Sequence, residues 1–144
     1  MYDNILLPTD GSEGMDVVIE HARELAAVHD ATLHTLYVAN TASLSDLPME
    51  SSWEGVNSAL HQQGKRAVQA VEESIGNLPV ETGVVDGSPS KEIVSYAEDE
   101  GCDVIVMGTH GRSGVDRLLL GSVAERVIRS APVPVMTVNV DQLD

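Results

Sequence analysis

The sequence is poor in cysteine and in lysine, and it has no long apolar run. Cys102 is the only cysteine, which excludes an internal disulfide framework and a cysteine-based metal cluster. No apolar run approaches the roughly 20 residues of a membrane-spanning helix. The start, MYDNILLP, has neither a basic region nor a small-residue cleavage site. We therefore expect no secretory signal and a cytoplasmic location.

Basic residues are also scarce. Eight lysines and arginines stand against 23 aspartates and glutamates, a formal net charge of −15 at pH 7. This charge disfavours binding to nucleic acid or to an anionic membrane. The acidic residues are dispersed and only Lys65 and Lys91 are lysines, which favours adaptation to high salt; an ordinary acidic cytosolic protein is the alternative. Because the overall charge repels anions, any phosphate-binding site in such a chain must rely on local dipoles, nearby arginines and Mg²⁺.

Apolar residues make up 42% of the 144 residues and recur in periodic blocks, so we expect one folded domain over residues 1–144. Short apolar runs predict five strands, and blocks with helical spacing lie between them. The strands are expected at residues 4–8, 32–38, 80–85, 104–107 and 133–138.

Capping and turn residues set the expected element ends. Ser12 is predicted to cap the first helix, and Ser88, followed by Pro89, the third. The stretch from Ala39 to about Gly55, which contains the only tryptophan, is predicted to be an irregular loop.

The alternation of strands and helices predicts an α/β fold, a five-stranded parallel sheet with helices on both faces. Because Pro134 has no N–H to donate, the last strand is expected at an edge or at a bulge. Ligands of such sheets bind where the strand order reverses, and we place that point between the first and fourth strands. The loops at residues 9–11 and 108–122 then face each other across one crevice.

The second of these loops is rich in glycine. The apolar run at residues 104–107 leads into Gly108, Gly111 and Gly114, and Gly121-Ser122 open the next helix. Glycine allows a close approach of the backbone to a ligand, and a helix N-terminus offers unpaired N–H groups. The pattern predicts a phosphate cradle. Glycines near a strand end are also common as plain turn residues, so that alternative stays open.

The segments MGTHGRSGVDRLLLGSVAERVIRSAPVPVMTV and NILLPTDGSEGMDVVIEHARELA resemble the C-terminal half and the start of the universal stress protein family. The resemblance covers nearly the whole chain and is weakest from Ala39 to about Val68. Its most specific element is Gly108-x-x-Gly111, nine residues, then Gly121-Ser122. This spacing resembles the mark of the family's ATP-binding branch. It implies a Rossmann-like fold that binds ATP with Mg²⁺.

The resemblance also implies a role for individual residues. Asp10 would contact a ribose hydroxyl or help to hold the metal, and Val38 would form an apolar wall beside the adenine. The implied nucleotide contacts are Pro8, Thr9, Asp10, Val38, Met107, Gly108, Gly111, Arg112, Gly121, Ser122 and Val123. A homodimer is implied as well, with the last strands, Val133 to Val138, paired across a two-fold axis.

Several of these residues have a plainer interpretation. Asp10 precedes a glycine and can bond its own backbone in a turn, while Arg112 and Arg117 can pair with surface carboxylates. His110 lies between motif glycines, but no nucleophile stands near it in the sequence. Cys102 is interpreted as a small residue at a strand start. The remaining histidines show no metal-ligand spacing and are expected at the surface or its boundary: His21, His29, His34 and His61.

The predicted function is that of an ATP-binding module of the stress response, acting as a homodimer. No P-loop lysine (GxxxxGK[ST]) is present, and no residue stands out as a base for an attacking water. One alternative is a slow ATPase in which Asp10 and Mg²⁺ polarise the phosphates. Another is a nucleotide-free interaction protein whose glycine loop is only structural.

Overall fold

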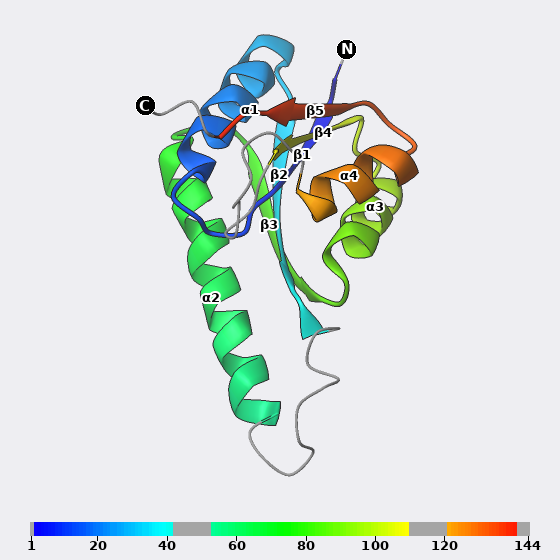
Figure 1. Cartoon of the computed structure of the whole chain (residues 1–144). Helices are drawn as coiled ribbons and strands as arrows, with labels where there is room; N and C mark the ends of the chain where they lie inside the picture. Colours follow the sequence, from blue (N-terminus) through cyan, green and yellow to red (C-terminus); the bar gives the residue numbers. More distant parts are fainter. Residues whose placement is uncertain (1, 42–52, 110–120, 141–144) are drawn as a thin grey trace.

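Figure 1 shows the computed structural model of the chain, which describes residues 2–41, 53–109 and 121–140. Strands and helices alternate along these residues. In order, the elements are β1 (Asn4–Pro8), α1 (Met15–His29), β2 (Thr32–Ala39), α2 (Trp53–Ser74), β3 (Val80–Asp86), α3 (Pro89–Asp99), β4 (Val104–Gly108), α4 (Ser122–Ser130) and β5 (Val135–Val138).

The five strands form one parallel sheet in the order β3-β2-β1-β4-β5. This confirms the predicted α/β fold and the reversal of strand order between the first and fourth strands. β5 lies at an edge, as Pro134 indicated. The strand begins only at Val135, however, and not at residue 133. The carbonyl of Pro134 accepts the Ile105 N–H at 3.0 Å, but its nitrogen has no N–H to donate to the ladder.

Helices cover both faces of the sheet (Figure 1). The alternation of side chains along β1 shows how: Ile5 and Leu7 belong to the core under α1, and Leu6 belongs to the core under α3 and α4. All three side chains are fully buried. Right-handed crossovers account for the two layers of helices. The connections from β1 to β2 and from β2 to β3 lie on one face of the sheet. The connections from β3 to β4 and from β4 to β5 run in the opposite direction along the sheet and therefore lie on the other face.

Two further predicted element ends are wrong. Ser12 does not cap α1, which begins at Met15 with Gly14 in the cap position. The reason is that Ser12 belongs to the preceding turn, where its own N–H is bonded to the Asp10 carboxylate. The predicted irregular loop is also too long at its end, because α2 starts at Trp53; residues 42–52 lie outside the described residues. Ser88 does stand in the cap position of α3.

The surface position predicted for His34 is wrong as well. His34 is only 3% exposed, and it lies on β2 in the core. Sequence spacing could not show this, because the partners that make burial tolerable come from other elements: the Tyr96 hydroxyl on α3 and the Asn4 side chain on β1. Cys102 is buried directly before β4, as expected of a small structural residue.

Among the described residues, none of the helices combines the length and the apolar character needed to cross a membrane.

Candidate functional site

The hydrogen-bonded ladder between neighbouring strands is short at the point where the strand order reverses. β1 pairs with β2 at five positions along its whole length, but with β4 at only two, Ile5 with Val104 and Leu6 with Ile105. The carboxyl ends of β1 and β4 therefore continue beyond their common ladder, and the segment after each strand leaves from the same edge of the sheet. This is the position at which ligands of open parallel sheets bind.

The turn after β1 is fixed by its own side chains. The Thr9 hydroxyl accepts the Gly11 N–H at 3.1 Å, and Asp10 Oδ1 accepts the Ser12 N–H at 2.9 Å. Gly11 has φ of +77°, a conformation that favours glycine. Asp10 thus has the turn role that its place before a glycine allowed. The turn bond uses one carboxylate oxygen of a half-buried side chain.

The start of α4 lies against the end of β4. The Gly121 N–H donates to the Thr109 carbonyl at 2.7 Å, and Gly121 has an extended backbone in the cap position. None of the described side chains caps the helix. As in any helix, the N–H groups of its first turn have no partner within the helix. Gly108 and Gly121 are thereby brought to one place, with Ser122 exposed at the first helical position.

Part of the glycine loop lies outside the described residues. This applies to Gly111 and Arg112 among the predicted nucleotide contacts, and to His110 and Arg117. The predictions for them stay predictions.

Three apolar side chains among the predicted nucleotide contacts gather on the α3–α4 face of the sheet. Met107 is buried in the core of that face, and Val38 and Val123 pack against the same core. Pro8 is buried at the end of β1. The structure therefore brings apolar residues from β2, β4 and α4 to the same face of the sheet.

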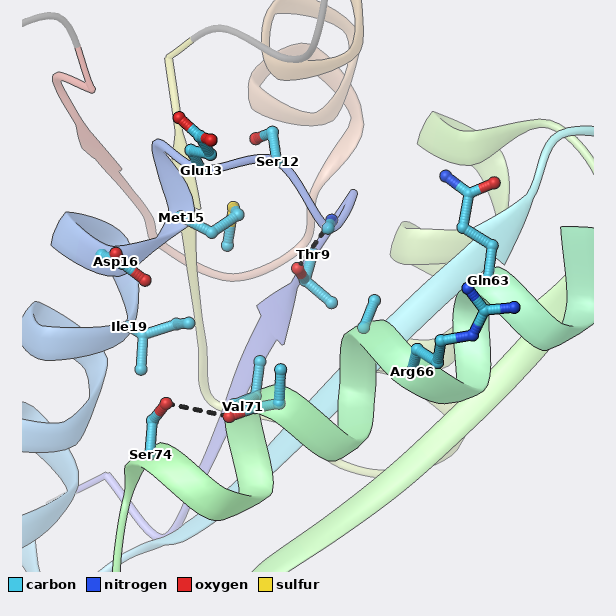
Figure 2. Close-up of a pocket in the computed structure, with 13 residues that line it drawn as sticks. Thr9, Ser12, Glu13, Met15, Asp16, Ile19, Gln63, Arg66, Val71 and Ser74 are labelled. Carbon is cyan, nitrogen blue, oxygen red and sulfur yellow. Dashed lines mark hydrogen bonds between the residues drawn. The ribbon is translucent and has the colours of Figure 1, made fainter.

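Thr9, another predicted nucleotide contact, lies elsewhere. Its side chain lies on the opposite side of the sheet and lines a cavity of about 370 Å³ between α1 and α2 (Figure 2). Its N–H is bonded to the Leu36 carbonyl. No pattern in the sequence predicted this cavity, whose lining includes small side chains of α2, Ala67 and Ala70.

The described residues include no group of three or more histidine, cysteine, aspartate or glutamate side chains that could hold a metal ion. A cation at Asp10 would therefore need ligands other than a cluster of such side chains, and phosphate and water oxygens are of the kind that Mg²⁺ prefers.

Comparison with known proteins places this fold and its loops in a family. Residues 1–139 match the model of the universal stress protein family. A universal stress protein of Methanocaldococcus jannaschii is 39% identical over 141 residues, which cover 96% of this chain and 83% of the relative. The chain belongs to the universal stress protein family.

Solved structures agree with this assignment. A second universal stress protein of Methanocaldococcus jannaschii superposes with a TM-score of 0.85 at 31% identity, covering 96% of both chains. A universal stress protein in complex with cAMP has a TM-score of 0.70 at 24% identity, covering 97% of this chain and 98% of its own. A universal stress protein from Archaeoglobus fulgidus in complex with dAMP has a TM-score of 0.65 at 21% identity, covering 94% of this chain and 97% of its own. The last two likenesses show the fold, and each ligand belongs to the protein named.

Proposed function

We propose that this chain is a nucleotide-binding universal stress protein of the ATP-binding branch, holding ATP with Mg²⁺ at the point where the strand order reverses. The single observation that carries the proposal is the bond from the Gly121 N–H to the Thr109 carbonyl. It fixes a helix N-terminus, which no described side chain caps, beside the end of β4, where the N–H groups of the first turn and the helix dipole favour an anion.

Two further observations support the proposal. Val38, Met107 and Val123 provide an apolar surface on the same side of the strand ends, as an adenine ring requires. Universal stress proteins in complex with cAMP and with dAMP share this fold. In the proposed role the chain works as a single cytoplasmic domain, and its occupancy by nucleotide serves as a signal in the stress response.

Calorimetric titration of ATP with Mg²⁺, in high KCl, tests the proposal on the parent chain and on Gly121→Val. Gly121 has φ of −65° and ψ of 155°, which any L residue adopts, so the variant should fold. We expect saturable binding in the parent and a loss of at least about tenfold in the variant, because the new side chain occupies the phosphate position.

Gly83→Ala is the matched control. Gly83 lies on β3, and a Cβ there would meet its nearest neighbour, Leu36 Cδ1, at 3.4 Å, an ordinary contact. Its ATP affinity should equal that of the parent. No binding in a folded parent protein would refute the nucleotide proposal and favour the interaction module.

We also propose a homodimer that pairs through β5. This strand forms an edge of the sheet, and its Met136 is 39% exposed. A second copy of the strand would cover both the free edge and this side chain. Sedimentation should show a dimer for the parent chain and a monomer for Met136→Lys. Val28→Lys, at the more exposed apolar residue on α1, should remain a dimer.

High salt is the proposed working condition of the protein. The net charge of −15 arises from dispersed acidic residues, whose mutual repulsion is screened by concentrated salt.

A further inference from the structure

The edge of the sheet that β3 forms has no partner strand among the described residues (Figure 1). β3 pairs only with β2, through a parallel ladder of seven positions. The proposed dimer uses the opposite edge, β5, which is four residues long. Because an exposed strand edge is a template for a further strand, β3 stays available to another molecule in the dimer as well.

The outward hydrogen-bonding groups of this edge can be assigned to residues. The Leu33 N–H donates to the Pro79 carbonyl at 2.9 Å. At the other end, the Gly87 N–H donates to the Ala39 carbonyl at 3.0 Å. The odd-numbered residues of β3 are therefore the ones bonded to β2. The even-numbered residues direct their N–H and C=O groups to the open edge, where no described backbone group meets them. These residues are Val80, Thr82, Val84 and Asp86.

The devices that commonly block a strand edge are missing from β3. Lysine, proline and bulges discourage the addition of a strand. β3 contains neither lysine nor proline, and its register with β2 is continuous. Its two acidic residues are Glu81 and Asp86. Since Asp86 is paired with His61 of α2, Glu81 is the acidic residue of the strand that has no partner in the described part of the chain.

Carboxylates gather on the α3 side of the edge. Burial raises the pKa of Tyr96 to about 12, and the charges of Glu100 and Glu81 add to the shift, so both carboxylates lie near this side chain. The Glu92 side chain lies over Gly87, directly after β3, where an added Cβ would be 2.7 Å from its Oε2. None of the three carboxylates forms an ion pair with a described residue. This acidic side repels a second copy of the same strand and attracts a basic segment.

The α2 side of the edge is more apolar. Val80 and Val84 are half-buried and pack against the buried residues beneath α2. Thr82 lies between them and is exposed. Successive side chains of a strand point to opposite faces of the sheet. A strand added to this edge would therefore place every second side chain on the acidic side and the others on the apolar side.

We propose that the β3 edge binds an extended segment of another protein in which lysine or arginine alternates with apolar residues. The segment adds a strand to the sheet through the outward backbone groups of β3. Its basic side chains lie beside Glu81, Glu92 and Glu100. Its apolar side chains lie beside Val80 and Val84. The backbone hydrogen bonds supply affinity, and the alternation of charge selects the partner.

Fluorescence anisotropy tests the proposal without nucleotide, using a labelled peptide as long as β3, blocked at both ends, in which valine and lysine alternate. One control peptide has the same composition with its lysines in a single block, which controls for general attraction to an acidic protein. The other has glutamate in place of lysine. We expect saturable binding of the alternating peptide and at least about tenfold weaker binding of either control. No saturable binding to the folded protein, or equal binding of a control peptide, overturns the proposal.

Variants locate the site. Glu81→Lys changes an exposed side chain, so it should fold normally, and it should weaken binding of the alternating peptide by at least about tenfold. Glu24→Lys is the matched control, because it makes the same change of charge at an exposed residue of α1, a helix that packs on β1 and β4. It should bind the peptide as the parent does. Equal binding by Glu81→Lys and the parent would contradict the proposal.

Amide hydrogen exchange gives a second readout, which reports on the backbone rather than on charge. With the alternating peptide bound, the amides of Thr82, Val84 and Asp86 should gain protection, because they point to the open edge. The amides of Gly83 and Val85, which are already bonded to β2, should change little. Protection gained at β5 and at no amide of β3 would overturn the proposal. Because nucleotide is absent, these results are independent of the ATP titration.

Discussion

His34 and Tyr96 join the sheet to α3 through a hydrogen bond in the core. His34 Nδ1 lies 3.0 Å from the Tyr96 hydroxyl oxygen, and its Nε2 lies 3.0 Å from Asn4 Oδ1. In the neutral tautomer that fits these partners, Nε2–H donates to Asn4 and Nδ1 accepts from Tyr96. The two rings also meet edge to face, with centroids 5.8 Å apart. One side chain thus ties together β1, β2 and α3.

Removing the tyrosine hydroxyl should destabilise the protein. In Tyr96→Phe the nitrogen of a buried ring loses its partner, and we expect the free energy of unfolding to fall by about 1–3 kcal/mol. Urea unfolding measures this change. Tyr2→Phe is the control, because Tyr2 has a ring contact with His29 and no hydroxyl hydrogen bond within the described residues. Equal stability of Tyr96→Phe and the parent would contradict a structural role for the bond.

Alkaline pH should destabilise the fold through Cys102 and Tyr96. Burial raises the pKa of the Cys102 thiol from 9.0 to about 12, with a smaller effect of Glu100. Burial likewise raises the pKa of Tyr96 from 10.0 to about 12. Both groups are held neutral in the folded state, so their contribution to stability is complete below pH 9.0 and is lost as the pH rises toward about 12.

Urea midpoints measured across this pH range test the linkage. Cys102→Ala should lose part of the alkaline decline, because the unfolded chain then has no thiol to ionise. The folded parent should also react slowly with a thiol reagent at the pH at which the unfolded chain reacts at once. Rapid modification of the folded chain would show that the thiol is accessible and ionised.

At Gly64 helix α2 lies close against the sheet. A Cβ at this position would lie 2.5 Å from Tyr37 Cδ1 and 3.0 Å from Val84 Cγ1. We expect Gly64→Ala to lower the free energy of unfolding by about 1–3 kcal/mol through overpacking. Gly55→Ala, at an exposed position of the same helix, should instead stabilise by up to about 1 kcal/mol. Thermal unfolding of both variants separates packing from helix propensity.

Salt should stabilise the protein, because it screens the repulsion among the acidic residues. At about 1 M salt the screening length falls to roughly 3 Å, so the repulsion behind the net charge of −15 largely disappears. We expect the melting temperature to rise with KCl. Neutralising the exposed Glu98, Asp99 and Glu100 together as their amides should reduce that rise. A melting temperature independent of KCl would refute the adaptation to high salt.

The sheet could be predicted from the sequence because its buried strands are local apolar runs. The run from Asn4 to Pro8 has the same bounds as β1, and the parallel sheet with helices on both faces followed from the alternation of strands and helices. His34 and Ser12 could not be predicted in this way. The burial of His34 depends on Tyr96, 62 positions away in the chain, and the turn that removes Ser12 from the helix end depends on a side chain two residues earlier.

Asp10 provides the sharpest test of the proposed site, because its turn role and its metal role can be separated. Asp10→Asn keeps an oxygen that can accept the Ser12 N–H, so the turn should be preserved, while the negative charge is lost. If the carboxylate helps to hold Mg²⁺, the variant should bind ATP with Mg²⁺ at least about tenfold more weakly than the parent. It should bind ATP without metal at least as well, since a like charge has been removed.

Asp10→Ala completes the comparison, because it removes both the charge and the acceptor for the Ser12 N–H. Loss of steady phosphate release in this variant, with ATP binding retained, would favour the slow ATPase over the binding module. A parent chain that releases no phosphate would exclude the ATPase. If Asp10→Asn and the parent bind ATP with Mg²⁺ equally well while Asp10→Ala does not, then Asp10 acts only through the turn. The metal would in that case be held by the nucleotide and by water.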